Sequence, residues 1–295
     1  MSRVLIAGCG YVGSALAERL ACEGHQVWGM RRYVASLPAG VEPIESDLSV
    51  SADLTSLPAG LTDVLYMAGP AGSDDALYRT AYVEGLGNLL AALESQGQRP
   101  RRIFFVSSTA VYAQSKGEWV DENSPTEPTH FSGRRLLEAE QILRESSFAS
   151  CVVRFGGIYG PRRARLIDQV RTGQAEFYKG TSQHVNRIHR DDCVGVLHHL
   201  MGLKSPLPLV LAVDDDPAEQ KEVLRWLAGV LGAPPPRELS ARSWRERSSR
   251  ARERNRTDRA PSNKRCRNEL LHATGYEFVH PTFREGYTAI LADLV

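Results

Sequence analysis

The residues of this chain that are best spaced for chemistry are three glycines near its start, arranged as Gly-x-Gly-x-x-Gly. They follow a short apolar run, Val4–Ala7, and a helix-like run, Ser14–Leu20, comes directly after them. In such a strand–turn–helix unit the first glycine allows a tight turn, the second lets the backbone approach a pyrophosphate, and the third lets helix and strand pack closely. Backbone N–H groups at the helix start add positive potential. A purely structural glycine turn is the alternative. The loop residues that we expect to line a dinucleotide are Gly8, Gly10, Tyr11, Val12 and Gly13.

The choice of nucleotide depends on the residues that end the second predicted strand, His25–Met30. A site for NAD typically has an acidic residue there, about 20 residues past the glycines, that bonds the ribose hydroxyl. This chain has Arg31 and Arg32 instead. Two guanidinium groups can hold a 2′-phosphate with paired hydrogen bonds. We therefore predict NADP as the cofactor, with NAD less favoured. The alternative is that one or both arginines are solvated in a loop.

Further cofactor contacts are expected where the other predicted strands end, because ligands of open parallel sheets bind at the carboxyl ends of the strands. The third strand leads to Asp47, whose carboxylate would reach an adenine. The fourth strand runs from Val64 to Ala68, and the fifth, Arg102–Val106, delivers hydroxyl groups to the same edge. The cofactor residues expected at these strand ends are Asp47, Leu48, Ala68, Gly69 and Ser107.

The overall charge is almost balanced, with 36 basic and 35 acidic residues among 295. We therefore expect no global attraction to nucleic acid or to a membrane surface. The segment from Arg237 to Arg267 is locally basic, with twelve basic residues against four acids. Its run of arginines between 242 and 259 could neutralise phosphates, and nucleic-acid binding through that run would show a steep dependence on salt. Trp244 is its sole aromatic residue, so a solvated loop, or a loop that closes over an anionic substrate, is the preferred interpretation.

The five cysteines are widely spaced and show neither CxxC nor histidine-rich spacing. This pattern is typical of reduced thiols, and it favours a cytoplasmic protein without a metal site. The apolar start is broken by glycines and followed by Glu18 and Arg19, which indicates a first strand and not a signal peptide. No stretch approaches the length that spans a membrane.

Strand and helix signals alternate after the glycine loop, which predicts an α/β fold of the Rossmann type, a doubly wound parallel sheet with a small C-terminal substrate lobe. We place the dinucleotide-binding domain at residues 1–155 and the substrate lobe, with elements returning to the first domain, at 156–295. The segment 234–261 is expected to be a loop and 263–273 a helix. The remaining expected strands lie at 41–44, 151–155 and 207–213, and the expected helices at 75–93, 136–143, 191–203 and 218–231.

Several motifs together resemble the extended short-chain dehydrogenase/reductase superfamily, the NAD(P)-dependent epimerase/dehydratase group. With GxGxxG in place of the commoner GxxGxxG, and Asn263–Arg265 before the expected last helix, the chain looks most similar to the atypical bacterial subgroup of YeeZ-type proteins. The resemblance spans nearly the whole chain. Besides the glycine loop, its motifs are Val106–Tyr112, Arg154–Pro161 and Asn186–Asp192.

The resemblance implies a Tyr-x-x-x-Lys pair at the start of the helix before the sixth strand, where lysine lowers the phenol pKa for proton exchange. The chain reads His130-Phe131-Ser132-Gly133-Arg134-Arg135-Leu136 there. The paired positions fall on Phe131 with Arg135, on His130 with Arg134, or on Ser132 with Leu136, and none restores a phenol beside an ammonium group. A literal Tyr-x-x-x-Lys occurs at Tyr112–Lys116, but it lies in a loop after the fifth strand, and we interpret it as a packing tyrosine.

The resemblance also assigns roles to individual residues. Ser108 matches the hydroxyl that bonds the reacting substrate oxygen, although it could instead satisfy the local backbone. Thr109 and Ala110 stand where sugar-nucleotide dehydratases carry Asp-Glu, which disfavours elimination. His130 could supply a proton near neutral pH, and Arg135 could bond a ribose. The candidate catalytic residues are therefore Ser108, His130 and Arg135, with a surface role for His130 as the alternative.

Other polar residues near these motifs have structural interpretations. Asp192 most often caps or orders a loop in similar proteins, and His189 belongs to the same helix-start signature. Glu138 and Glu140 are expected to be solvated or paired with Arg134 and Arg135 across a helical turn.

These observations predict an NADP-dependent oxidoreductase or epimerase that transfers hydride on a small polar substrate with a non-standard proton donor. A non-catalytic NADP(H) sensor or partner-binding protein is the rival hypothesis, because loss of both Tyr and Lys is what it predicts. The expected partner is a small-molecule substrate, with neither nucleic acid nor membrane. Similar proteins often dimerise through a four-helix bundle, so a homodimer is an expectation that rests on the resemblance.

Overall fold

The computed structural model describes residues 1–163, 165–178, 182–240, 243 and 262–293. The chain divides into two compact units. Unit 1 comprises residues 1–111, 127–155 and 193–210, and unit 2 comprises 112–126, 156–192 and 211–295. The arginine run predicted between 242 and 259 lies outside the described residues.

Unit 1 is organised around a seven-stranded sheet of order β11-β7-β5-β4-β1-β2-β3. Each neighbouring pair from β3 to β7 is parallel, and the order reverses direction between β1 and β4, as in doubly wound folds. The inner strands are largely apolar because both faces of a parallel sheet are covered, whereas the edge strand β3 is mostly exposed. The strands are β1 (Arg3–Ala7), β2 (Gln26–Arg31), β3 (Val41–Glu45), β4 (Asp63–Tyr66), β5 (Arg102–Ser108), β7 (Ser150–Phe155) and β11 (Leu209–Ala212).

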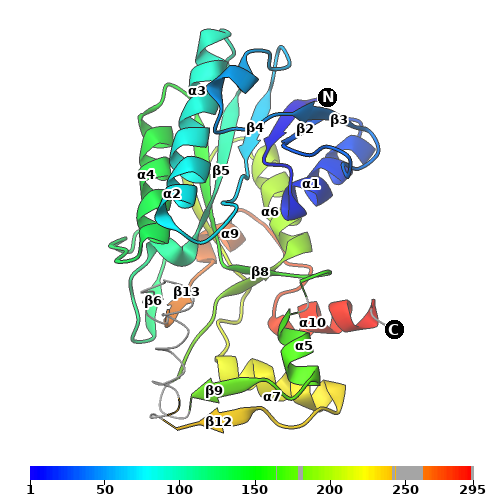
Figure 1. Ribbon diagram of the computed structural model, residues 1–295, viewed down its shortest axis with the longest axis vertical. Helices are drawn as coiled ribbons and strands as arrows, with labels where there is room; N and C mark the ends of the chain where they lie inside the picture. The colour runs from blue at the N-terminus through cyan, green and yellow to red at the C-terminus, as the bar shows by residue number, and fades with distance from the viewer. Residues whose placement is uncertain (164, 179–181, 241–242, 244–261, 294–295) are drawn as a thin grey trace. The chain divides into compact units, whose positions relative to one another are not determined.

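Helices flank this sheet in two groups, as Figure 1 shows. On one side α1 (Tyr11–Cys22) and α6 (Arg190–Gly202) are joined by a 2.7 Å contact between His198 Nε2 and Glu23 Oε2. On the other side α4 (Phe131–Glu145) packs against a long helical segment, which consists of α2 (Asp75–Tyr78), a π-helical turn η2 (Arg79–Glu84) and α3 (Gly85–Ser95). Short 3-10 turns lie at Ser51–Leu54 and Thr109–Val111.

The described residues of unit 2 form short parallel strand pairs and four further helices. The pairs are β8 (Gly157–Tyr159) with β10 (Arg187–His189), β9 (Glu176–Tyr178) with β12 (Arg237–Leu239), and β6 (Glu118–Val120) with β13 (Lys264–Cys266). The helices are α5 (Arg165–Arg171), α7 (Gln220–Leu231), α9 (Glu269–Ala273) and α10 (Phe283–Ala292).

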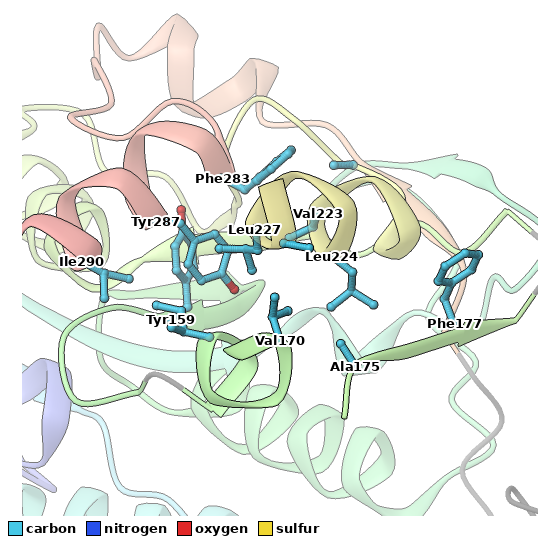
Figure 2. Close-up of a cluster of buried hydrophobic side chains, with 13 residues drawn as sticks. Tyr159, Val170, Ala175, Phe177, Val223, Leu224, Leu227, Phe283, Tyr287 and Ile290 are labelled. Carbon is cyan, nitrogen blue, oxygen red and sulfur yellow. The ribbon is translucent and has the colours of Figure 1, made fainter. Parts of the chain in front are cut away.

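An apolar cluster of buried side chains holds α5, α7 and α10 together, and Figure 2 shows its members interdigitating between these helices. Tyr159 and Tyr287 pack with ring centroids 4.7 Å apart. Gly286 on α10 makes room for this pair, because a Cβ at that position would overlap the phenol of Tyr159. This cluster gives unit 2 a hydrophobic core of its own.

The α/β sheet predicted from the alternating pattern is confirmed, but some C-terminal elements differ from the expectations. The segment 263–273 is not one helix: Lys264–Cys266 forms β13, and only Glu269–Ala273 is helical. The expected loop 234–261 includes β12. The pairing of Lys264–Cys266 with Glu118–Val120 explains the first difference, and the buried Lys264 Nζ, which donates to the Tyr112 carbonyl at 3.1 Å, also ties this stretch to a distant part of the chain.

Candidate functional site

The glycine loop is built so that the chain turns sharply between β1 and α1. Gly8 has φ +85°, in the left-handed region that favours glycine. A Cβ at Gly8 would overlap the backbone N and Cα of Ala68, in the segment that follows β4. The N–H groups of Gly8 and Cys9 both donate to the Met30 carbonyl at 3.0 Å. The loop therefore lies in close backbone contact with the segments that follow β4 and end β2.

Gly10 and Gly13 have different reasons to be glycine. A Cβ at Gly13 would lie 3.1 Å from Ile6 Cγ2, so its absence allows α1 to pack closely on β1. A Cβ at Gly10 would meet no described atom nearer than 3.8 Å, and Gly10 is exposed as the N-cap residue of α1. Folding therefore leaves space at Gly10, which is what the approach of a pyrophosphate to the helix N-terminus requires.

The residues predicted to select the nucleotide lie at the carboxyl ends of β2 and β3. Arg31 ends β2, and its Nη1 donates to Ser36 Oγ at 3.2 Å. Asp47 accepts hydrogen bonds from the Ser49 hydroxyl at 2.7 Å and the Ser49 N–H at 3.0 Å. These bonds lower the pKa of Asp47, and the nearby charge of Arg32 acts in the same direction. Two guanidinium groups thus lie at the end of β2, and that of Arg32 is near the Asp47 carboxylate.

The other predicted cofactor residues have varied environments. Ala68 lies against Gly8, as described, and the Leu48 carbonyl accepts a hydrogen bond from the Asn88 side chain at 3.0 Å. Ser107 is buried, and its hydroxyl donates to Glu140 Oε1 at 2.6 Å. Gly69 has no described atom within 4 Å of an added Cβ. Among these residues, Ala68 therefore lies directly against the glycine loop, whereas the Ser107 hydroxyl points into the protein interior.

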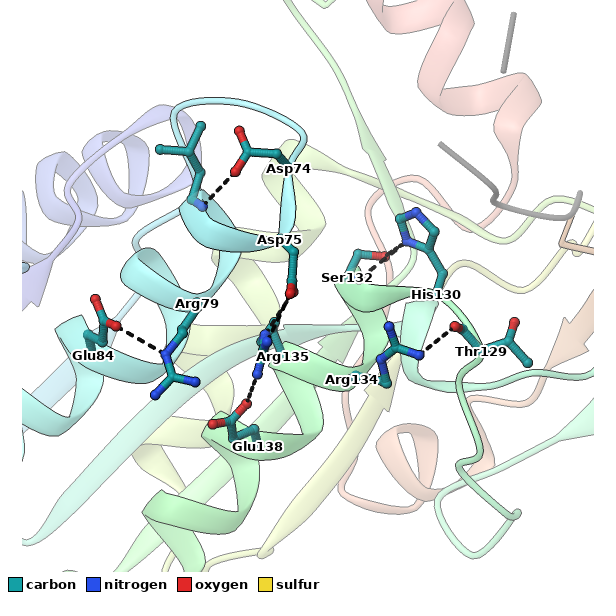
Figure 3. Close-up of polar contacts among 11 residues, drawn as sticks. Asp74, Asp75, Arg79, Glu84, Thr129, His130, Ser132, Arg134, Arg135 and Glu138 are labelled. Carbon is teal, nitrogen blue, oxygen red and sulfur yellow. Dashed lines mark hydrogen bonds and ion pairs between the residues drawn. The ribbon is translucent and has the colours of Figure 1, made fainter. Parts of the chain in front are cut away.

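The first turn of α4 carries the positions where the resemblance expects tyrosine and lysine. His130 is the N-cap residue of α4, and its Nδ1 accepts from the Ser132 N–H at 3.2 Å and contacts the Ser132 hydroxyl at 2.8 Å (Figure 3). Its ring also lies on Phe131, with centroids 4.0 Å apart. The imidazole thus has a structural role in starting the helix, in addition to any chemical role.

Arg135 is held by two carboxylates. Its Nε and Nη2 bond the two oxygens of Asp75 at 2.8 and 2.9 Å, and its Nη1 bonds Glu138 at 2.6 Å, as Figure 3 shows. These bonds raise the pKa of Arg135 further above its ordinary range. One helical turn earlier, Phe131 packs edge-on against Tyr78 with centroids 5.2 Å apart. In the alignment that pairs Phe131 with Arg135, both positions therefore contact α2, and Arg135 is poorly suited to donate a proton.

Ser108 ends β5 and is half-buried, with its Oγ accepting from the Ala110 N–H at 3.2 Å. This is a local backbone contact of the kind expected if the Ser108 hydroxyl has a structural role and does not bind substrate. The literal Tyr-x-x-x-Lys of residues 112–116 lies in unit 2. Tyr112 is buried there, and its hydroxyl donates to the Asp121 carbonyl at 2.8 Å, while the Lys116 side chain is exposed. The contact supports the packing role expected for Tyr112.

A buried ion pair under α4 was missed by the sequence interpretation. Glu140 was expected to be solvated or paired across a helical turn, and this is wrong: it is fully buried and accepts from Arg154 Nε at 3.0 Å and Nη2 at 2.6 Å. The expectation for Glu138 is confirmed by its bond to Arg135. The spacing of Leu136, Glu140 and Leu143 places Glu140 on the inward face of α4, and that periodicity could have revealed it.

Asp192 has an ordering role within unit 2. It is fully buried, and its carboxylate accepts from the backbone N–H groups of Val279 at 2.7 Å and His280 at 3.0 Å and from the Tyr276 hydroxyl at 3.1 Å. These contacts attach the segment before α10 to the start of α6.

Comparison with known proteins decides the family. Residues 4–206 match the model of the NAD dependent epimerase/dehydratase family. The chain belongs to that family. The epimerase/dehydratase match covers more than half of the chain and includes the glycine loop, β5 and α4, and the family to which the chain belongs uses a nicotinamide cofactor.

Two curated relatives extend this assignment. A 3-diazoavenalumate denitrifying reductase from a Streptomyces species is 29% identical over 96% of this chain and 98% of its own length. Protein YeeZ from Escherichia coli K12 is 30% identical over 68% of this chain and 73% of its own length. Relatives along the chain are reductases and epimerases, which places this epimerase/dehydratase member among the oxidoreductase and epimerase enzymes.

Solved structures agree with the fold. A protein from Methylobacillus flagellatus, assigned to the NAD-dependent epimerases/dehydratases, is 36% identical with a TM-score of 0.78 and covers 99% of this chain and 98% of its own. A human epimerase family protein solved with NADPH has a TM-score of 0.81 at 21% identity, covers 99% of both chains, and shares the fold. Among the described helices, none combines the length and the apolar character needed to cross a membrane.

Proposed function

We propose that this chain is an NADP-dependent oxidoreductase that transfers hydride on a small polar substrate without the usual Tyr-Lys proton donor. The observation that carries the proposal is the first turn of α4, where none of the three possible alignments pairs a tyrosine with a lysine and where Arg135 is bound by Asp75 and Glu138. When bound, the nicotinamide supplies or accepts the hydride. The residues of the chain must then bind and orient the substrate and provide any proton.

Two arginines at the end of β2 support a preference for NADP. Arg31 is the last residue of that strand and Arg32 follows it, where an NAD site typically has an acidic side chain. The Arg31 guanidinium bonds a hydroxyl group, Ser36 Oγ, and no described ion pair holds Arg31 or Arg32. A 2′-phosphate would thus meet two guanidinium groups that can turn toward it.

The side chains at the start of α4 differ in their ability to deliver a proton. Arg135 stays protonated, because two carboxylates stabilise its charge. His130 Nδ1 accepts the Ser132 N–H, which in the neutral ring leaves a proton on Nε2. We propose that Ser108 orients the substrate and that His130 or a water molecule delivers the proton. Loss of a positioned general acid costs about 10²–10⁴-fold in rate, so turnover on ordinary carbonyl substrates should be slow.

The substrate class follows from the same arrangement. A substrate whose reduction needs no proton from the protein would be unaffected by the missing phenol. The Streptomyces relative is named for a diazo compound and for removal of nitrogen. When hydride reduces an arenediazonium group, a C–H bond forms, the C–N bond breaks, and N₂ leaves with the bonding pair, so no proton is consumed. We propose that acceptors of this kind are better substrates for this chain than ketones.

The experiment is a titration with NADPH and NADH by fluorescence, followed by NADPH oxidation assays on ketones, imines, nucleotide-sugars and an arenediazonium salt. Replacing Arg31 and Arg32 by alanine should weaken NADPH binding much more than NADH binding. Arg144→Ala, an exposed arginine on α4, is the matched control. Equal losses for the two cofactors would refute the NADP assignment.

Turnover that disappears in Ser108→Ala would support the oxidoreductase. The packing of Phe131 against Tyr78 also suits a second candidate, a non-catalytic NADP(H) sensor or partner-binding protein. Tight NADPH binding without turnover on any of these substrates would favour that candidate. Saturation of the rate with a diazonium salt but not with a ketone would support the proposed substrate class.

A further inference from the structure

Unit 2 brings two histidines and an aspartate together at the junction of β10 and α6. His189 ends β10, Asp191 lies in the first turn of α6, and His280 precedes α10. One ligand atom from each of these three side chains lies within 4.8 Å of the other two. His189 and His280 are 91 positions apart in the sequence, so the fold and not the local sequence brings them together.

From this convergence we propose that His189, Asp191 and His280 form a binding site for a divalent transition-metal ion, with zinc the best match. Imidazole nitrogens together with one carboxylate are ligands that zinc accepts, and three protein ligands leave a fourth position open to water or a small anion. This inference concerns unit 2 alone and does not depend on the proposed reaction.

The separations are compatible with one ion after a small side-chain movement. A tetrahedral zinc ion with ligand bonds of about 2.0–2.1 Å separates its ligand atoms by about 3.3 Å. His189 Nδ1 and Asp191 Oδ2 are already 3.7 Å apart. The widest pair, at 4.8 Å or less, must close by about 1.5 Å. Asp191 can make this movement because its side chain is 44% exposed.

The surrounding residues hold the ligands in place. The Asp192 carboxylate accepts the backbone N–H groups of Val279 and His280, which fixes the second histidine beside the first. The rings of His189 and His280 are 4.0 Å apart between centroids, with planes inclined by 60°.

Two nearby groups oppose the ion. The Asp191 backbone N–H donates to His189 Nδ1 at 3.3 Å, so this nitrogen must exchange that hydrogen bond for the ion. Arg190 donates to Asp191 Oδ1 from Nε and Nη2, both at 2.8 Å. Its charge weakens the attraction of the carboxylate for a cation but leaves Oδ2 facing His189. We therefore expect moderate affinity, and removal of this charge in Arg190→Gln should strengthen binding.

The test is isothermal titration of Zn²⁺ into the metal-free full-length chain in a Cys22→Ser background, which removes the exposed thiol. We expect one ion per chain, and a visible absorption band when Co²⁺ replaces it. His280→Gln and Asp191→Asn should each weaken binding at least tenfold. In the unsubstituted site Zn²⁺ should also raise the temperature of unfolding.

Two controls separate this site from other histidine–carboxylate contacts. His272→Ala removes an exposed pair with Asp215 in the same unit and should leave the affinity unchanged. His198→Ala removes the contact with Glu23 in unit 1 and should also have no effect. Binding that survives both ligand variants, or that is lost in His198→Ala, would overturn the proposal, as would the absence of saturable binding.

Discussion

Replacing Gly10 by alanine should separate cofactor binding from folding. The added methyl group would meet no described atom nearer than 3.8 Å, and φ at this residue is −99°. We therefore expect the free energy of unfolding to change by less than about 1 kcal/mol, as for other exposed substitutions. The methyl group would instead occupy the space through which a pyrophosphate approaches the start of α1.

The size of the binding defect follows from the bonds that the methyl group blocks. A hydrogen bond to a charged group contributes about 1.5–3 kcal/mol, so loss of one backbone bond to the pyrophosphate should weaken NADPH binding about 10–150-fold. The assay is a fluorescence titration with NADPH, alongside urea unfolding followed by tryptophan fluorescence.

Two further glycine variants make this experiment decisive. Gly8 and Gly24 have nearly the same φ, +85° and +83°, so alanine at either position should cost about 1–2 kcal/mol in backbone strain. Nothing lies within 4 Å of a Cβ at Gly24, whereas a Cβ at Gly8 would overlap Ala68. Gly8→Ala should therefore lose about 1–3 kcal/mol more than Gly24→Ala, together with NADPH binding. Wild-type NADPH affinity in Gly10→Ala, or equal stability of the Gly8 and Gly24 variants, would refute this account of the loop.

Three other variants test contacts within unit 1 or within unit 2. Glu140→Ala leaves Arg154 buried without its carboxylate, so the free energy of unfolding in urea should fall by about 3–5 kcal/mol. Glu138→Ala, on the outer face of the same helix, should lower it by less than about 1 kcal/mol. Similar losses in the two variants would contradict the buried ion pair. Burial raises the pKa of Asp214 well above its usual value, so the folded chain favours the protonated carboxyl group. The stability of the fold is therefore lost as the pH rises through the folded-state pKa. Asp214→Asn should raise the unfolding temperature at pH 7 but not near pH 3. His130→Ala removes the N-cap of α4 and should cost about 1 kcal/mol, whereas His130→Asn should restore the stability but not any proton transfer; a variant without loss of stability would remove the structural role of this ring.

The sequence supports the prediction of unit 1 because its signals are local. Buried strands of a parallel sheet are apolar runs, and the helix from Asp75 onward shows its inward face as Leu86, Leu89 and Leu93. The glycine spacing indicates the loop because Gly8 and Gly13 each avoid a specific overlap, whereas Gly10 leaves the start of α1 open. Local periodicity was therefore enough for the sheet and its first turn.

Unit 2 was harder to predict because its elements depend on distant contacts. The strand Lys264–Cys266 pairs with Glu118–Val120, about 150 residues earlier, and no local pattern announces such a pairing. Helix α10 did have a signal, since Thr282 and Glu285 form a capping box. The partners of Arg135 and Glu140 required the packing of α4 against its neighbours to be known, because a charged residue has the same appearance in sequence whether it is buried or solvated.

The two carboxylates that bind Arg135 constrain how this part of α4 can change by mutation. A change to the Tyr-Lys pair of conventional relatives needs more than Phe131→Tyr and Arg135→Lys, because a single ammonium group cannot bond both oxygens of Asp75 and Glu138 in the geometry that the guanidinium group provides. Asp75 would have to change as well. Effects of substitutions in one network are not additive, so single substitutions toward a Tyr-Lys pair should each cost stability. The bonds from Arg135 to Asp75 and Glu138 therefore oppose a stepwise conversion, and chains that share Asp75 and Arg135 should also share the absence of the tyrosine.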